Sequence, residues 1–246
     1  NGLKVGFQLE NGFGADDGTL KQDGRMFGRE SQVYAQGDLG LLSFGRVGPL
    51  VSGNGSFNFL AQMMPYGNQI AAYMAGTNSV MSYVAARVDN TVTYVSPRIE
   101  GFAFHAQYSM KNDVIRADRD GVENKSSSNR YAAAGISFRK GPIYAGLLAD
   151  RRFYAHKNGE AQTFTLGGSY DFEIAKLYVA GQYFKDVTNT TFSAGGVSSF
   201  SQVFSTGETK IDGYGLAVGT DIPALNGVIK MVAVYLNADS DSDQNS

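Results

Sequence analysis

Two arginines, Arg46 and Arg87, bracket a long stretch of this chain that carries no charge. Residues 47–86 contain no Asp, Glu, Lys or Arg, although 18% of the 246 residues are charged. A guanidinium keeps its positive charge at physiological pH and binds carboxylates, phosphates and other anions. With no acidic side chain between them, these arginines would favour anions if they faced a narrow, water-filled passage.

The uncharged stretch is also rich in aromatic side chains. The simpler interpretation is that these rings pack an apolar loop against a wall. The alternative is that exposed rings form a track for a sugar, which would make the passage specific for one substrate. The candidates for lining the passage are Phe57, Phe59, Tyr66, Tyr73 and Tyr83.

The segments that must position these residues alternate between apolar and polar positions. In residues 102–109, Phe102 and Phe104 fall on one face, and His105 and Gln107 fall on the other. Side chains alternate across a strand, so the segment predicts a strand with one apolar and one polar face. The apolar faces are rich in aromatic residues and the other faces are polar or small. This favours an all-β transmembrane antiparallel β-barrel around a water-filled lumen over a soluble β-sandwich.

Eleven such strands are predicted, joined alternately by tight turns and by longer polar loops. Short turns on one side and long loops on the other are typical of outer-membrane barrels. Single-chain bacterial barrels have an even number of strands, so we expect further strands beyond both ends of this chain. The predicted strands are Leu3–Glu10, Arg29–Gln36, Leu41–Val47, Thr91–Ser96, Phe102–Ser109, Tyr131–Lys140, Ile143–Phe153, Gln162–Phe172, Leu177–Lys185, Ile211–Ile222 and Val228–Asn237.

Residue parity assigns the two bracketing arginines differently. Arg87 shares its face with Asp89, Thr91 and Thr93, so it is predicted to point into the lumen. Arg46 falls on the apolar parity of its strand, and a bulge or the following loop would have to redirect it. Each arginine could instead lie at the membrane rim and extend its charge to water.

Other charged side chains fall on the polar faces of the predicted strands. They are of both signs, so the predicted preference for anions depends on the arginines at the narrowest point. The candidates for the lumen wall are Lys4, Glu10, Glu30, His105, Arg139, Asp150, Arg152 and Lys230.

Composition argues against several other classes of function. The chain has no cysteine, and its net charge of −2 gives no basic surface for nucleic acid. Asp16, Asp17 and the run Asp239–Asp243 lack the spacing of a calcium loop, so neither a metal nor a cofactor is predicted. Of the two histidines, His105 and His156, the first keeps a Ser/His hydrolase open as a minor alternative, because such sites are recognised by geometry.

Five motifs carry a resemblance to a known family, and the first four are specific in their order and spacing. They are NGLKVGFQLE at 1–10, FGRESQVY at 27–34, GLLSFGR at 40–46, RVDNTVTYVSP at 87–97 and FTLGGSY at 164–170. They resemble the general trimeric porins of Gram-negative bacteria, the betaproteobacterial type in particular. The similarity runs along the whole chain.

This resemblance implies that residues 1–246 form part of a sixteen-stranded barrel, from about its third to its thirteenth strand. It implies that Val47–Asn90 is a loop that folds into the barrel and narrows the pore. Constriction arginines are implied at Arg29 and Arg87, and Arg46 is a third candidate because it adjoins the loop. The barrel's first two strands and its last strand would then lie outside this chain, and a homotrimer is expected.

The sequence thus predicts an integral outer-membrane channel, bounded by lipid, for passive diffusion of small hydrophilic solutes and inorganic anions. No enzymatic activity is predicted. One alternative is a channel specific for a sugar or an organic acid. Another is a structural or adhesive barrel that does not conduct, and a soluble β-sandwich is the third. Conductance, and its block by a single solute, would separate these alternatives.

Overall fold

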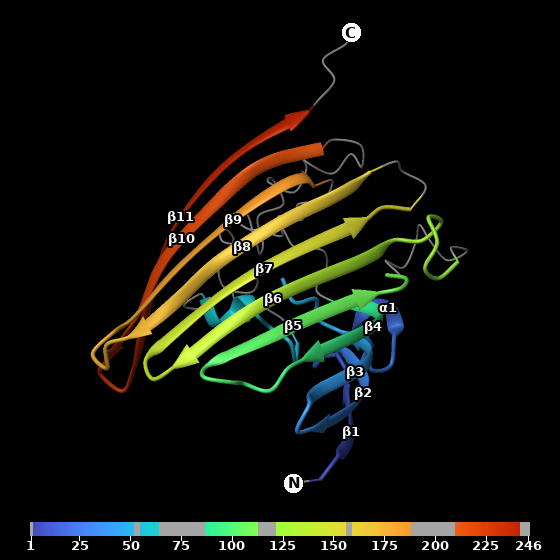
Figure 1. Ribbon diagram of the computed structural model, residues 1–246, viewed down its shortest axis with the longest axis horizontal. Helices are drawn as coiled ribbons and strands as arrows, with labels where there is room; N and C mark the ends of the chain where they lie inside the picture. Colours follow the sequence, from blue (N-terminus) through green and yellow to red (C-terminus); the bar gives the residue numbers. More distant parts are fainter. Residues whose placement is uncertain are drawn as a thin grey trace.

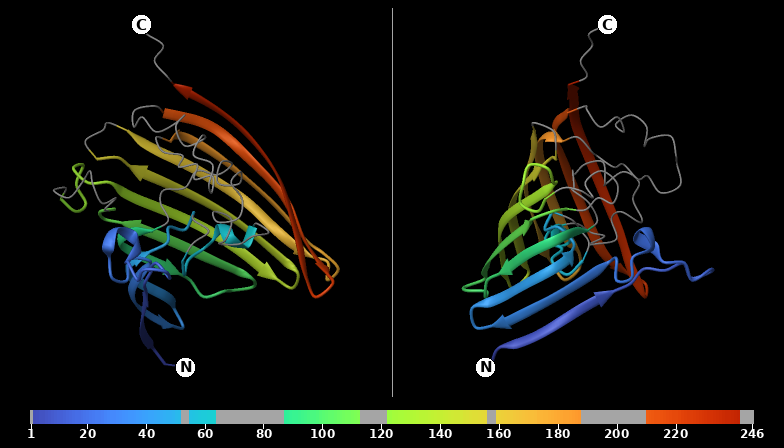
Figure 2. Two further views of the ribbon diagram at one scale, coloured as in Figure 1. Left: turned by 180° about the vertical axis from the view of Figure 1, so that it is seen from behind. Right: turned by 90° about the vertical axis from the view of Figure 1, so that its right-hand side faces the viewer.

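In the computed structural model the described part of the chain forms one antiparallel sheet of eleven strands (Figure 1). The structure describes residues 2–51, 55–63, 87–112, 122–155, 159–187 and 210–241. Each strand pairs with its neighbours in sequence, and the first and last strands have one partner each. The predicted all-β fold and the number of strands are confirmed. The described part is a curved, open sheet (Figure 2).

Most strands agree with their predicted bounds to within three residues. The strands are β1 (Lys4–Glu10), β2 (Glu30–Gly37), β3 (Gly40–Val47), β4 (Val88–Val95), β5 (Phe102–Ser109), β6 (Arg130–Lys140), β7 (Ile143–Phe153), β8 (Glu160–Asp171), β9 (Lys176–Val187), β10 (Lys210–Ala224) and β11 (Gly227–Asp241). The edge with the connections 38–39, 96–101, 141–142, 172–175 and 225–226 is called the turn end, and the opposite edge the loop end.

The last hairpin is longer than predicted. Strands β10 and β11 have 15 residues each and pair from Lys210 opposite Asp241 to Ala224 opposite Gly227. The prediction that the last strand ends at Asn237 was therefore wrong. Alternating Asp and Ser indicated a solvated loop, but ladder hydrogen bonds use backbone groups and form regardless of those side chains.

The helical pieces of the described part are short. They are α1 (Lys21–Gly24), which was not predicted, and the 3₁₀ turn η1 (Leu60–Met63). Within the described ranges, no helix has the length and apolarity needed to cross a membrane.

The two faces of the sheet have the opposite polarity to those of a soluble protein. On one face large apolar side chains are exposed, whereas the other face buries polar and small ones. A soluble β-sandwich would bury its apolar residues, so this pattern matches a strand between lipid and a polar interior. Exposed examples are Phe44, Phe102, Phe104, Ile136, Phe164 and Leu166, and buried examples are Ser43, Gln107, Ser109, Ser137, Thr163 and Thr165.

A small apolar core lies on the inner face of the sheet, where residues 47–51 and 55–63 approach the wall (Figure 2). Phe59 and Met63 pack there against wall residues that include Leu148. Gly146 makes the approach possible, because a Cβ at this position would lie 2.5 Å from Met63 Cε and 2.7 Å from the Phe59 ring. Interiors are close-packed, so any side chain at Gly146 would push the segment off the wall.

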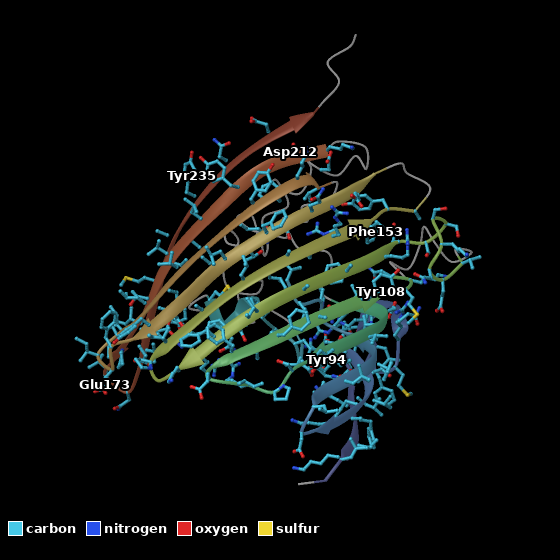
Figure 3. All side chains as sticks on the ribbon, viewed as in Figure 1. Tyr94, Tyr108, Phe153, Glu173, Asp212 and Tyr235 are labelled. Atoms are coloured by element: carbon cyan, nitrogen blue, oxygen red, sulfur yellow. The ribbon has the colours of Figure 1, made fainter. Side chains whose placement is uncertain are left out.

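Aromatic side chains pair on the outer face near the turn end. Phe102 and Phe138 have ring centroids 4.8 Å apart, and those of Tyr170 and Phe172 are 4.4 Å apart. Figure 3 shows the neighbouring Glu173 at this end, whereas Tyr108 and Phe153 lie toward the loop end of their strands. Aromatic girdles of this kind mark the interfaces between lipid and water in membrane barrels.

We predict that Leu166→Arg destabilises the protein and that Val122→Arg does not. The two side chains are exposed to similar extents, at 63% and 60%, but Leu166 lies in the middle of β8 and Val122 lies in a loop. An arginine on the lipid face costs about 2–4 kcal/mol near the bilayer midplane. The measurement is the free energy of unfolding by guanidinium chloride in phospholipid vesicles. Equal values for both variants would contradict a lipid-facing outer surface.

Candidate functional site

The three arginines predicted for a constriction lie together at the loop end of β1 to β4. With a fourth arginine and three carboxylates they form a group that we call the rim cluster. Each of its arginines contacts an acidic side chain, and four guanidiniums against three carboxylates leave a formal charge of +1. The members are Arg25, Arg29, Arg46, Arg87, Glu10, Glu30 and Asp89.

Asp89 is the centre of one half of the rim cluster. Its carboxylate accepts hydrogen bonds from Arg25, at 3.0 Å, and from Arg46. Arg46 reaches Asp89 because the register between β3 and β4 shifts between Gly45 and Val47, and a bulge re-aims the side chains around it. Gly45 has a φ of 137°, which is accessible to glycine and disfavoured for other residues.

Arg29 and Arg87 form the other half of the rim cluster with Glu10. Arg29 Nε donates to the Glu10 carboxylate, and Arg87 Nη2 lies 3.7 Å from Glu10 Oε2. Arg87 also donates through Nε to the backbone carbonyl of Arg29. The Arg29 side chain is 44% exposed and that of Arg87 only 6%. The Arg29 side chain is therefore partly exposed to solvent, whereas that of Arg87 is buried.

Arg25 is a member of the site that the sequence did not identify. Its side chain is 32% exposed, and it follows α1 in the connection between β1 and β2. The alternation of apolar and polar residues along a strand does not predict where a side chain in a loop points. Only the folded connection brings Arg25 to Asp89, which is 64 residues away in the sequence.

The carboxylate of Glu30 ties residues 55–63 to the wall. Glu30 is completely buried, and it accepts hydrogen bonds from Ser56 through the backbone N–H at 2.7 Å and the hydroxyl at 2.6 Å. Gln8 Nε2 donates to the same carboxylate at 2.7 Å. The wall residue predicted from parity thus fixes where the segment lies on the inner face.

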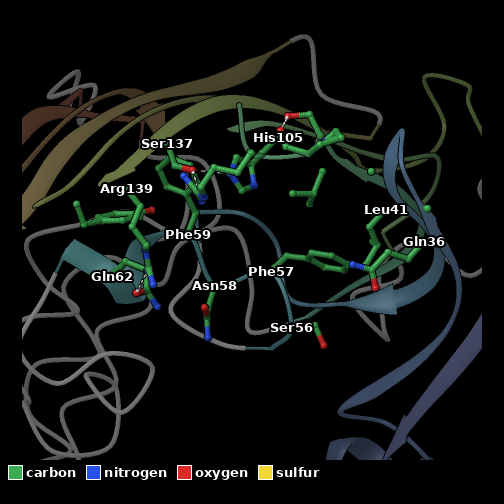
Figure 4. Close-up of a pocket in the computed structure, with 17 residues that line it drawn as sticks. Gln36, Leu41, Ser56, Phe57, Asn58, Phe59, Gln62, His105, Ser137 and Arg139 are labelled. Carbon is green, nitrogen blue, oxygen red and sulfur yellow. Dashed lines mark hydrogen bonds between the residues drawn. The ribbon is translucent and has the colours of Figure 1, made fainter. Parts of the chain in front are cut away.

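A pocket of about 590 Å³ opens on the inner face near the turn end (Figure 4). Of the residues predicted to line the lumen, Phe57, Phe59, His105 and Arg139 border it. Arg98 also borders the pocket but was not predicted, because it lies in the turn before β5. Arg139 Nη2 donates to Gln62 Oε1 at 2.6 Å, which joins the wall to η1.

The structure brings one serine and one histidine together in this pocket. His105 Nε2 lies 2.9 Å from Ser137 Oγ, and the edge of the Phe59 ring contacts the imidazole with centroids 5.1 Å apart. In the described part of the chain, no carboxylate contacts His105, so the orienting group of a catalytic triad is missing there. The described part of the chain includes no group of His, Asp and Glu side chains that could hold a metal ion.

Two further predicted wall residues form a buried pair on β7. Arg152 Nε lies 3.8 Å from Asp150 Oδ1, and Thr163 donates its hydroxyl proton to the same carboxylate. Both charged residues are only 4% exposed. This pair therefore belongs to the packed wall and does not reach a passage directly.

The remaining predicted residues divide into two groups. Lys4 is exposed on the edge strand β1, and Lys230 on β11 pairs with Asp221 of β10. The other group, Tyr66, Tyr73 and Tyr83, lies outside the described residues.

An antiparallel sheet with an apolar outer face and a polar inner face is the wall of a transmembrane β-barrel. Residues 1–246 match the Gram-negative porin family, so the chain belongs to that family. Membership of this family places it in the outer membrane.

Relatives and solved structures agree with this assignment. An outer membrane porin protein of Bordetella pertussis is 32% identical over 73% of this chain and 48% of the relative. Outer membrane porin protein 32 of Delftia acidovorans is 28% identical over 72% of this chain and 48% of the relative. The chain thus spans about half the length of these two relatives. The solved anion-selective porin from Comamonas acidovorans shares the fold, with a TM-score of 0.59 and 22% identity over 98% of this chain and 65% of that one.

We predict that Asp89→Asn lowers the stability of the protein far more than Glu160→Gln. Asp89 forms ion pairs with both Arg25 and Arg46 and its side chain is 12% exposed, whereas Glu160 pairs with Arg151 where both side chains are at least 38% exposed. Breaking a buried pair costs about 3–5 kcal/mol, and an exposed pair contributes about 0–1 kcal/mol. The measurement is again unfolding by guanidinium chloride. An Asp89→Asn variant as stable as Glu160→Gln would show that the rim cluster does not hold the loop end together.

Proposed function

We propose that this chain forms part of the wall of a water-filled channel, through which small hydrophilic solutes diffuse across the outer membrane. The observation that carries the proposal is the inverted polarity of the sheet in a member of the porin family. A polar inner face solvates a solute in transit, and the apolar outer face contacts lipid. The hypotheses of a non-conducting barrel and of a sugar-specific channel have no comparable support.

We also propose that the channel prefers anions. The rim cluster has one more positive than negative charge, and its three most exposed side chains are two arginines and one acid, namely Arg29 at 44%, Glu10 at 36% and Arg25 at 32%. The pocket near the turn end adds two arginines and no acid. Low-dielectric walls focus such a field along the passage, and arginines in a pore favour anions. The solved structure that shares the fold is itself named an anion-selective porin.

The constriction in this proposal lies between the rim cluster and the segment that starts after β3. Among Arg29, Arg46 and Arg87, Arg29 has the most exposed side chain and would contact a passing anion directly. The other two would contribute charge from the wall.

Inorganic anions, outer-membrane lipids and two further copies of the protein in a homotrimer are the proposed partners. A molecular mass three times that of the monomer, measured by light scattering in detergent, would support the trimer.

The first test is the reversal potential of the full product of the gene in a planar bilayer under a gradient of KCl. We expect a steady conductance and a reversal potential near the equilibrium potential of chloride. A conductance with a reversal potential near the equilibrium potential of potassium would support the proposed channel but overturn its preference for anions. The absence of conductance would overturn the channel.

Reversing the charge of one arginine tests whether that arginine sets the preference of the channel for anions. Arg29→Glu should shift the reversal potential toward that of potassium, because it replaces the exposed positive charge at the rim cluster by a negative one. Lys140→Glu makes the same change in net charge at the turn end, where the lysine side chain is 68% exposed and pairs with Glu100. This control should leave the potential within a few millivolts of the wild-type value, since exposed charges are screened within about 8–10 Å. Equal shifts in both variants would show that net charge, and not the rim cluster, sets selectivity.

A further inference from the structure

The pocket near the turn end differs from the rim cluster in how its arginines are neutralised. Every arginine of the rim cluster contacts a carboxylate, whereas Arg98 and Arg139 have neutral partners throughout the described chain. Arg98 donates to the Gly101 carbonyl at 2.6 Å and lies 3.4 Å from Ser137 Oγ. The nearest acid in sequence, Glu100, pairs with Lys140 and is 85% exposed. The positive charge of the pocket is therefore not compensated.

Both guanidiniums have hydrogen-bond donors to spare. A guanidinium carries five N–H groups in a planar fork. The described bonds of Arg139 occupy only Nη2, and its Cζ lies over the Tyr144 ring, 5.2 Å from the ring centroid. A ring beneath a guanidinium holds it in place and leaves its edge free. That edge is suited to bidentate binding of a carboxylate.

The remainder of the pocket combines apolar side chains with polar ones, which include Gln36, Asn58 and Gln62, and it is of a size that fits a small organic molecule. Phe57 is half-buried and points toward Leu41 across the pocket from Arg139 and Gln62 (Figure 4). Phe59 forms the floor beside His105. Ligand sites are usually about 300–1,000 Å³ in volume, and this pocket of about 590 Å³ lies in that range. A hydrated chloride ion in this pocket would leave the aromatic side chains in contact with water, whereas an organic molecule could cover them.

We propose that this pocket binds an organic anion that has one carboxylate and a flat apolar body, of which benzoate is the simplest form. The carboxylate bonds to Arg139 or Arg98, and the apolar body lies against Phe57. The site makes the channel retain such anions longer than inorganic ones. This inference rests on the proposed function, because the pocket faces the passage that the channel would provide.

The experiment is block of the chloride current by three probes in a planar bilayer at about 0.1 M KCl, where screening is moderate. Benzoate supplies both the carboxylate and the ring, acetate supplies the carboxylate alone, and benzamide supplies the ring without the charge. The half-blocking concentration of benzoate should be at least ten times lower than those of acetate and benzamide. This comparison uses the unaltered protein, so it does not depend on the folding of any variant.

Three variants then locate the site. Arg139→Gln should raise the half-blocking concentration of benzoate about tenfold, which corresponds to the loss of one charge-assisted hydrogen bond. Phe57→Leu should raise the same concentration about threefold by removing the ring contact. Arg151→Gln is the matched control, because Arg151 points to the outer face and pairs with Glu160. It should change the value less than twofold.

Each outcome separates the two proposals. A protein that conducts chloride but is blocked equally by benzoate, acetate and benzamide overturns the binding site and leaves the channel intact. The same holds if Arg139→Gln and Arg151→Gln alter the block equally. A protein that conducts no ions overturns the channel, and the binding site with it.

Discussion

A bilayer contains no water to bond a free backbone amide or carbonyl, so strands that cross it must pair all of these groups with one another. The uninterrupted order of neighbours gives β2 to β10 a partner on both sides in the described sheet, whereas β1 and β11 have one partner each. Once the backbone is paired in this way, each residue faces either lipid or the lumen. The apolar outer face, the polar wall and the positions of the arginines all depend on this alternation.

The segment after β3 lies against the polar wall, and the two together form the candidate site. It is held at two points by different means: Glu30 binds Ser56 through its carboxylate, and Gly146 leaves room for Phe59 and Met63. Polar anchoring near the rim cluster and apolar packing over β6 to β9 together hold the segment against the wall. If this segment forms the proposed constriction, it must keep its shape while solutes pass, and the two contacts together resist its displacement better than either alone.

Charge compensation distinguishes the two arginine groups on the inner face. Most charged groups of the rim cluster are paired with one another, so the cluster supports the structure and keeps only a small net charge. The arginines of the pocket bond to neutral oxygens and keep their charge available. An anion moving between the two ends would meet a nearly balanced region and a positive one. In the proposed channel, selectivity would depend on where positive charge is left uncompensated as well as on how many arginines the wall contains.

The sequence by itself determined the eleven strands, their neighbours and the side of the wall on which most residues lie, because these follow from alternation and local turn residues. It also singled out Glu30, Arg87, His105 and Arg139 as inner-face residues from parity. Only the tertiary structure decided which charges are paired. Arg25 and Arg98 lie in connections where alternation has no meaning, and a shifted register re-aims Arg46. Ion pairs join residues far apart in the chain, so their geometry depends on the assembled sheet.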